Sequence, residues 1–474
     1  MFNNEQNFSL KEFFSPLTTV KAICIIAVVG IFVFFNSLFN GFVWDDYDYI
    51  ISNLAFNKFD FPGLVGVNMY NSPEAGFYRI IPALYFAGLH QLFENNAFFY
   101  HAIQIILHII TTILFYHFLK KLLSNNVSFF LSLVFLVHPM NIESVAYIAA
   151  GSPSILLFLF GISALLLSVK DRITIPRLLL ISALLLLSVL TKETGVFFVL
   201  LVPLLRILYR KKQTVALILS ALAVLLIYLI MRFKTIGFNY HPLHNFIPID
   251  NISQIQRLYT IPKIIFYYIQ TFVFPAKLAI AQNWTVTTPD FQHFFLPMLL
   301  DIIFFFGSGL FGFYVYKQNR EQGKLFIFFC LWFVIGLGQL LQIVPLDMTV
   351  ADRWFYFPMA GLLGMLGVGI TALHLNSSRL TYPVAITAIL LIGILSIRTI
   401  VRNTNWYDPV TLYTHDIQVH EDYYLEGALG EYLKHKGMVG QAMPHYKKAL
   451  ELNPYLRKDY WFYYWVENYN HTEE

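Results

Sequence analysis

Apolar runs, each about as long as one membrane crossing, recur along most of this chain. A helix needs about 20 mainly apolar residues to cross a bilayer. Only 13% of the 474 residues are charged and 57% are hydrophobic, whereas soluble domains carry about a quarter charged residues. We therefore predict an all-α polytopic membrane protein with about 11 transmembrane helices. The runs centre on residues 20–39, 97–119, 126–142, 146–168, 175–191, 194–209, 213–233, 295–316, 323–344, 354–374 and 380–400.

Basic residues fall in alternate loops between these runs. Lysine and arginine are enriched in the cytoplasmic loops of membrane proteins. The asymmetry predicts a cytoplasmic N-terminus, with loops 40–95 and 234–294 and everything after residue 401 on the outer side. The same residues form no stripe of the kind that binds nucleic acid. They are Lys120, Lys121, Lys170, Arg172, Arg177, Arg210, Lys211, Lys212, Lys317, Arg320, Lys324 and Arg379.

Two apolar segments need separate interpretation. The first run, at about 20–39, lacks a small-residue cleavage site, which indicates a retained signal anchor rather than a removed signal peptide. Segment 257–274, "RLYTIPKIIFYYIQTFVF", is interrupted by Pro262 and Lys263. A full crossing there would place the basic loop at 317–324 outside. We expect an interfacial or re-entrant helix, with a full crossing as the alternative.

The chain changes character after residue 401. We predict a membrane domain over 1–401 and a soluble helical tail over 402–474, with one tetratricopeptide repeat at about 421–454. A single repeat cannot bury its own apolar face. Either the segment "DYWFYYWVENYN" caps it or the tail packs on the membrane domain. Residues on the pattern positions of this 34-residue repeat are Leu429, Gly430, Ala442, Tyr446, Ala449 and the closing Pro454, with Gly437 in the turn between helices.

Polar residues cluster near the ends of the crossings, all on the predicted outer side. Ionised groups beside hydrocarbon are costly and mark functional sites. Carboxylates deprotonate or orient a hydroxyl group, while arginine and lysine neutralise phosphate. The set fits a reaction that pairs a base with an anionic leaving group, such as phosphate on a lipid carrier. Its members are Asp45, Asp46, Asp48, Arg79, His138, Glu143, Lys192, Glu193 and Arg353.

Each of these residues also has a structural interpretation. Asp48 is more simply a solvated or capping residue than a reacting one. His101 and His108 are seven residues apart and share one helix face, which favours polar packing over a metal pair. The alternative role of Glu193 is to cap the next helix, and that of Lys192 is to snorkel to the membrane interface. The alternative role of His138 is to end a helix before Pro139, and that of Arg353 is to anchor the chain at the interface.

An ordered series of motifs resembles a known family. The series resembles the transmembrane-and-tetratricopeptide-repeat O-mannosyltransferases and their bacterial relatives, in the GT-C glycosyltransferase superfamily. Any one motif is weakly specific, but the order is fairly specific, and the resemblance extends from about residue 36 to 454. The motifs are "GFVWDDYDYI", "FYRIIPALYF", "HAIQIILH", "HPMNIESVAYIAAGSPSILLFLF", "TKETGVFFVLL", "FVFPAKLA", "ADRWFYFPMAG" and "NWYDPVTLYTHDIQVH", followed by the repeat.

The resemblance implies a reaction. GT-C enzymes transfer a sugar, here mannose or a related hexose, from a polyprenyl-phosphate donor to a hydroxyl acceptor on a protein or glycan. Transfer proceeds with inversion on the outer face. By position, the resemblance makes Asp45 the general base and Asp46 its partner, which orients the acceptor or binds a divalent metal where one is used. No other cofactor is expected beyond the lipid-linked donor.

The remaining site residues follow from the same resemblance. It implies that Arg353 holds the donor phosphate together with Lys192 and Arg79, with support from the other matched positions. The chain departs from the family where Ile80 replaces the proline of an "RP" pair, and in having one repeat instead of a long array. The acceptor is therefore left open between protein, glycan and lipid. The supporting positions are His138, Glu143 and Glu193.

Other functions have their own sequence signatures. A lipid-linked glycan transporter or flippase predicts polar residues near the bilayer midplane and inverted repeats, and neither is evident. A catalytically silent scaffold that recruits a partner protein through its repeat would make Asp45 and Arg353 dispensable. An O-antigen ligase or polymerase is a third alternative. The short single-repeat tail favours a bacterial inner membrane with the tail in the periplasm.

Overall fold

The computed structural model describes residues 17–53, 77–237, 247–373 and 381–458, together with Phe56, Phe61 and Leu64. Within these ranges the regular structure is helical, apart from one isolated antiparallel β-bridge between Gln282 and Val350. Much of the predicted outer loop 40–95, part of loop 234–294, Arg379 and the segment 459–470 lie outside the described residues.

A helix occurs at every predicted crossing position. Eight helices of the described ranges are long and apolar enough to cross a membrane, and α7 together with η4–α8, bent by 52° at the break between them, makes a ninth candidate. This confirms an all-helical, polytopic membrane architecture; the total of eleven crossings stays a prediction. Of the helices at the predicted positions, α10 and α11 are too short to be among these candidates. The helices at the predicted positions are α2 (Thr19–Phe34, extended by η1, Phe35–Phe39), α6 (Ala97–Lys120), α7 (Asn125–Val137), α9 (Ile148–Ser168), α10 (Ile175–Thr191), α11 (Val196–Leu208), α12 (Thr214–Ile236), α15 (Leu296–Gln318), α16 (Arg320–Gly338), α17 (Tyr356–Ala372) and α18 (Thr381–Thr404).

Shorter elements connect these helices at the end where the site lies. Residues 257–273 of the segment 257–274 belong to one helix, α14 (Gln254–Val273), which starts with a capping box formed by Ser253 and Gln256 and continues through Pro262. This helix is not among the eight candidate spans, and its interfacial position stays a prediction. The other connecting elements are η2 (Tyr47–Ile51), α5 (Ile80–Phe93), η4 (Pro139–Asn141), α8 (Ile142–Ala146), η5 (Glu193–Gly195), α13 (Pro248–Asn251), η6 (Phe291–Phe295) and η7 (Asp352–Phe355).

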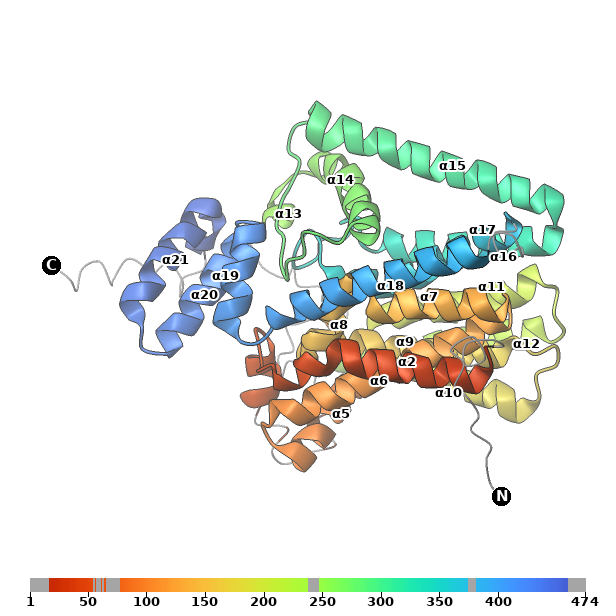
Figure 1. Cartoon of the computed structure of the whole chain (residues 1–474). Helices are drawn as coiled ribbons and strands as arrows, with labels where there is room; N and C mark the ends of the chain where they lie inside the picture. Colours follow the sequence, from red (N-terminus) through yellow and green to blue (C-terminus); the bar gives the residue numbers. More distant parts are fainter. Residues whose placement is uncertain are drawn as a thin grey trace, which may run out of the picture.

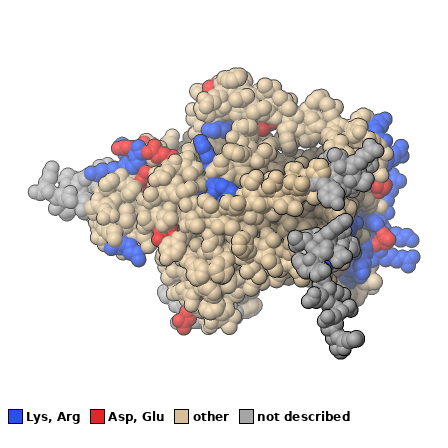
Figure 2. Space-filling view, viewed as in Figure 1, with Lys and Arg blue, Asp and Glu red and all other residues tan. Residues whose placement is uncertain are grey.

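The two ends of the bundle differ in charge. Most long helices run side by side, with the C-terminal helices at one end (Figure 1). Lysine and arginine side chains gather at the opposite end (Figure 2). Buried Arg206 organises that basic end by donating to the backbone carbonyls of Ser168 and Lys170, and Lys211 pairs there with Asp171. The alternating basic loops of the sequence thus meet at one end of the fold.

Helix α17 lies at the centre of the bundle and carries the loop that leads into the site. Nearly all of its residues are buried. Gly361 lies so close to α16 that a Cβ atom would approach the backbone nitrogen of Phe333 to 2.5 Å. Small residues permit such close helix contacts in membranes. Phe158 of α9 packs edge-on against Tyr356 at the start of α17, with ring centroids 5.4 Å apart. This packing fixes the position of η7, the short helix directly before α17 that contains Arg353.

The tail folds as three helices, α19 (Pro409–Val419), α20 (Tyr423–His435) and α21 (Val439–Leu452), followed by η8 (Pro454–Lys458). Gly437 lies in the turn between α20 and α21 with φ of 75°, a left-handed conformation that suits glycine. Gly430 faces the ring of Tyr446, and a Cβ there would lie 3.0 Å from the ring. The helix–turn–helix geometry agrees with the predicted repeat, whose assignment as tetratricopeptide stays a prediction.

The tail packs on the membrane domain, which is one of the two arrangements expected from the sequence. Arg402 near the end of α18 donates two hydrogen bonds to Asp416 of α19, of 2.6 and 2.8 Å. Asp416 also accepts the backbone N–H of Ile280 at 2.7 Å. Farther along, Asp422 accepts the backbone N–H of Asn283 at 2.6 Å. Because Asp416 and Asp422 are both buried, these bonds hold the tail firmly against the segment that follows α14.

Candidate active site

Asp46 anchors the acidic motif to the start of a membrane helix. Its carboxylate accepts the backbone N–H of Val43 at 3.0 Å and of Ala149 at 2.6 Å. Ala149 is the second residue of α9, so Asp46 satisfies a free N–H group at the positive end of that helix. Burial raises the pKa of Asp46 to about 8, against the opposing effect of these N–H bonds. Asp46 therefore fixes the turn in which Asp45 lies.

Asp45 is half-buried beside Tyr147, the residue that directly precedes α9. The Tyr147 hydroxyl donates a hydrogen bond to its carboxylate. Burial raises the pKa of Asp45 to about 6, while the Tyr147 bond and the charge of Arg353 act to lower it. A general base works best with a pKa near the working pH, so Asp45 suits that role. Asp48, three residues on, is exposed, which agrees with its interpretation as a solvated residue.

Arg353 is buried and is oriented by Glu143. The two Glu143 carboxylate oxygens accept hydrogen bonds from the Arg353 side chain at Nη1 and from its backbone N–H, the latter at 2.8 Å. The guanidinium carbon lies 5.6 Å from the ring centroid of Tyr147, and Nη2 lies 3.8 Å from a carboxylate oxygen of Asp347. With 6% exposure, Arg353 is not an interfacial anchor. It faces the same tyrosine as Asp45.

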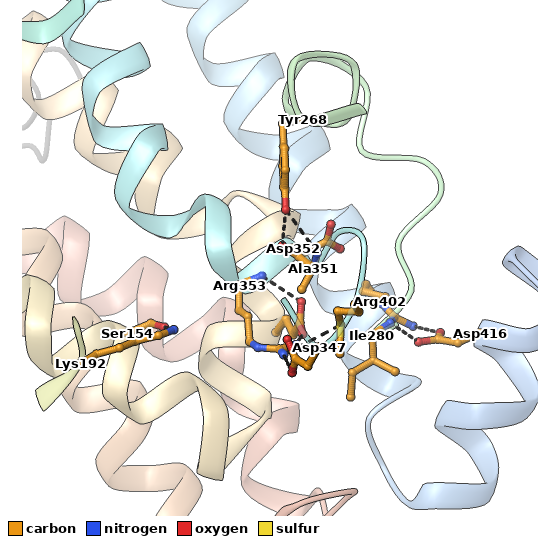
Figure 3. A network of polar contacts seen from close by, with 12 residues as sticks. Ser154, Lys192, Tyr268, Ile280, Asp347, Ala351, Asp352, Arg353, Arg402 and Asp416 are labelled. Carbon is orange, nitrogen blue, oxygen red and sulfur yellow. Dashed lines mark hydrogen bonds and ion pairs between the residues drawn. The ribbon is translucent and has the colours of Figure 1, made fainter. Parts of the chain in front are cut away.

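Lys192 and Arg79 form a second cationic group beside Arg353. Lys192 follows α10, and its Nζ donates to Ser154 Oγ at 3.3 Å (Figure 3). Burial, with the charges of Arg79 and Arg353, lowers the pKa of Lys192 to about 7. Arg79 donates through Nε and Nη2 to Glu193, at 3.1 and 3.0 Å. Although burial acts to raise it, the Arg79 guanidinium holds the pKa of Glu193 below its ordinary value. Glu193 thus balances the cations rather than capping a helix.

His138 has a structural place at the edge of the site. It ends α7, its Nδ1 accepts the backbone N–H of Met140 at 3.3 Å, and its Nε2 lies 3.0 Å from the carbonyl oxygen of Phe272. Its ring stacks on the Phe272 ring with centroids 5.0 Å apart. Both ring nitrogens are engaged, so His138 attaches α14 to the bundle. It does not join the group around Asp45 and Arg353.

His108 and His101 also have protein partners. His108 Nδ1 lies 2.9 Å from the hydroxyl of Tyr356 and Nε2 lies 3.0 Å from the carbonyl oxygen of Leu136. His101 Nε2 lies 3.4 Å from the carbonyl oxygen of Gly41. Both side chains are fully buried. These contacts agree with the prediction of polar packing residues.

A divalent metal on Asp46 was one implication of the family resemblance. Both oxygens of that carboxylate accept backbone N–H groups. Within the described ranges, no three histidine, cysteine or acidic side chains gather into a set that could hold a metal ion. The described residues around Asp46 therefore do not fit a divalent metal ion.

Sequence reasoning missed several residues of this site. One of them is Tyr147, which contacts both Asp45 and Arg353. The sequence feature that could have identified it is its position in "HPMNIESVAYIAAG", where one helix ends and the next begins. Asp347 lies six residues before Arg353 in the same loop. Asp352 accepts the hydroxyl of Tyr267 at 2.8 Å and so joins α14 to η7. Figure 3 shows Asp347 and Asp352 on the same stretch of chain as Arg353.

The fold and the site together define a polytopic helical membrane protein with an acidic pair and a cationic group at one end. Comparison with known proteins adds that the chain is related to protein O-mannosyl-transferases. It is 25% identical over 460 residues to a protein O-mannosyl-transferase of Caenorhabditis elegans and 22% identical over 480 residues to the human protein O-mannosyl-transferase TMTC3, each match covering 92% of this chain. A stretch of 106 residues is 30% identical to the protein O-mannosyl-transferase Tmtc2 of Drosophila melanogaster.

These relatives are longer than the chain. The matches span 63% of the nematode protein and 52% of the human one. The Drosophila match covers 22% of this chain and 11% of that protein. No protein-family model matches the chain.

Proposed function

We propose that this protein is a membrane glycosyltransferase of GT-C type. It transfers mannose or a related hexose from a polyprenyl-phosphate donor to a hydroxyl group, with inversion. The observation that carries the proposal is that Asp45 and Arg353, far apart in sequence, both contact Tyr147. A base and a phosphate-binding cation are thereby held at one place. The names of the relatives favour a protein as the acceptor, and its serine and threonine hydroxyl groups are the acceptors that we propose.

The reaction uses the side chains in distinct roles. Asp45 accepts the proton of the acceptor hydroxyl while its oxygen attacks C1 of the sugar from the face opposite the phosphate. The bond between C1 and the phosphate oxygen breaks, and its electron pair leaves with the polyprenyl phosphate. Arg353 and Lys192 stabilise that developing negative charge, with Arg79 held nearby by Glu193. Positioned opposite charges of this kind are a major source of catalysis.

The charge asymmetry between the two ends of the bundle supports an orientation in the membrane. We assign the basic end of the bundle to the cytoplasm. The site and the tail then lie on the outer side, in the periplasm of a bacterial inner membrane. A polyprenyl carrier reaches such a site from within the bilayer, while a protein acceptor reaches it from the aqueous side.

Transfer from a labelled polyprenyl-phosphate mannose to a serine- and threonine-containing peptide, in reconstituted membranes, tests this function. The comparison is between wild type, Asp45→Asn and the control Asp48→Asn, which removes an exposed carboxylate three residues away. We expect transfer by the wild type and the control and loss of about 100-fold or more in Asp45→Asn, the scale of a general base. Equal transfer by all three would exclude Asp45 as the base and favour a different mechanism. No transfer with any lipid-linked hexose or acceptor would favour the silent scaffold.

A further inference from the structure

The acidic motif is held in a strained backbone conformation. Trp44 has φ of 50°, a left-handed conformation that is uncommon for a bulky residue and persists only where its surroundings hold it. The turn around it is closed by the backbone N–H of Asp46, which donates to the carbonyl of Val43 at 3.0 Å. Asp45 is the next residue in this turn. The direction of the Asp45 side chain therefore depends on Trp44.

The contacts that hold Trp44 come from the tail, more than 360 residues away in the chain. Its backbone N–H donates to the hydroxyl of Tyr413 at 3.0 Å. Its ring stacks on that of Tyr424, with centroids 4.9 Å apart and planes at 18°, and meets the ring of Tyr413 edge-on at 5.7 Å. One hydrogen bond to its backbone N–H and two aromatic contacts with its ring thus hold Trp44 in this strained conformation.

The tail is itself fixed, so it can impose this conformation. The backbone N–H of Gly41, just before the turn, donates to the carbonyl of Tyr407 at 2.8 Å. The buried pair of Arg402 and Asp416 joins the tail to α18 (Figure 3). A tail that served only to recruit a partner would not need to touch the catalytic turn.

We propose that Tyr413 and Tyr424 are positioning residues for Asp45, and that they act through Trp44 to make the tail a working part of the active site. The catalytic meaning of this inference rests on the proposed glycosyl transfer. The positioning itself does not, because it concerns where the Asp45 carboxylate lies. Removing the contacts of Tyr413 and Tyr424 with Trp44 lets the turn relax and exposes Asp45 to water. Its pKa, raised by burial, then falls toward the ordinary value.

The test uses four variants of the full chain. Tyr413→Phe removes the hydroxyl acceptor but keeps the ring, and Tyr424→Leu removes the stacked ring. Tyr424→Phe keeps that ring and tests rescue. Tyr455→Phe removes an exposed tyrosine hydroxyl from η8 and is the matched control. Size-exclusion profiles in detergent establish that each variant is folded.

The first readout is independent of activity. A water-soluble carbodiimide labels protonated carboxyl groups, and tandem mass spectrometry, which assigns the label to Asp45 apart from Asp46 and Asp48 in the same peptide, follows labelling against pH. We expect a midpoint near pH 6 for wild type and Tyr455→Phe, a lower midpoint for Tyr424→Leu and Tyr413→Phe, and recovery in Tyr424→Phe. The charged and titratable groups that face Asp45 are unchanged in these variants apart from the substituted tyrosines themselves. They are Tyr147, Arg353, Asp347, Asp48, Asp46 and the tail phenols Tyr413 and Tyr424.

The second readout is the rate of sugar transfer. We expect kcat to fall about 5-fold in Tyr413→Phe, the effect of one neutral hydrogen bond, and further in Tyr424→Leu, with the donor KM unchanged. A shifted labelling midpoint without transfer by any protein upholds the positioning and overturns the proposed function. An unchanged midpoint overturns the positioning, whether transfer is retained or is lost through a raised donor KM.

Discussion

The Glu143 carboxylate accepts hydrogen bonds from both the side chain and the backbone N–H of Arg353, which lies 210 residues later in the sequence. One carboxylate thereby fixes the start of α17 and aims a guanidinium at Tyr147. Both residues are buried, at 3% and 6% exposure. Removing one partner of a buried ion pair leaves the other charge without compensation, which costs about 3–5 kcal/mol of stability.

Glu143→Ala should therefore lower the free energy of unfolding by about 3–5 kcal/mol. Reversible unfolding by denaturant in detergent, followed by tryptophan fluorescence, measures the change. The double variant Glu143→Leu with Arg353→Met is the control, because an apolar pair of similar volume replaces both charges and should recover most of the loss. A single variant as stable as the wild type would show that the pair does not hold η7 in place.

Asp45 and pH form the second prediction. The folded-state pKa of about 6 lies above the ordinary 3.8, so the folded protein binds the proton more tightly than the unfolded chain. Stability therefore falls as pH rises from about 4 to 6, and stays lower above that range. Asp45→Asn removes this penalty and should be at least as stable as wild type at pH 7. The advantage should vanish near pH 4 in melting experiments. A variant that is less stable at pH 7 would contradict the burial of an uncompensated charge.

The pH dependence of transfer gives the third prediction. Asp45 must be ionised to act as a base, so kcat/KM should rise through pH 6. Lys192 has a pKa lowered to about 7 by burial and by Arg79 and Arg353, so its positive charge is lost as pH rises through 7. The donor KM should then increase, which makes the profile bell-shaped. Lys192→Arg stays charged and should flatten the alkaline side. An unchanged alkaline limb in that variant would assign the limb to another group.

The sequence allowed good prediction of the membrane helices because each needs only a local run of apolar residues. The basic end of the bundle was predictable for the same reason, because the lysine and arginine residues occur in every second loop between these local runs. Partners across the fold were not predictable. No local sequence pattern predicts the contact of Trp44 with Tyr424 or of Arg402 with Asp416, because these contacts depend on how the folded helices pack against one another. His138 illustrates the limit. Its motif marked it as a site residue, yet the packing of α14 engages both its ring nitrogens in structural contacts.

Asp46 gives the fourth prediction, in contrast to its neighbour. Its two carboxylate oxygens each accept a backbone N–H group, from Val43 and Ala149. Asparagine offers one acceptor oxygen, so Asp46→Asn leaves one of these buried N–H groups without a partner. The expected loss is about 1–3 kcal/mol in the free energy of unfolding, with transfer reduced because the turn that holds Asp45 loosens.

The comparison with Asp45→Asn makes this prediction sharp. Two chemically identical substitutions at adjacent positions should differ in stability, with Asp46→Asn the less stable of the two. Both relieve a carboxyl group whose pKa burial raises, but only Asp46→Asn also removes an acceptor of two backbone N–H groups, one of them at the start of α9. Melting both variants in one detergent at pH 7 gives the answer. If Asp46→Asn melts as high as Asp45→Asn, then Asp46 does not hold the turn to α9, and the role of base can no longer be assigned to Asp45 in preference to Asp46.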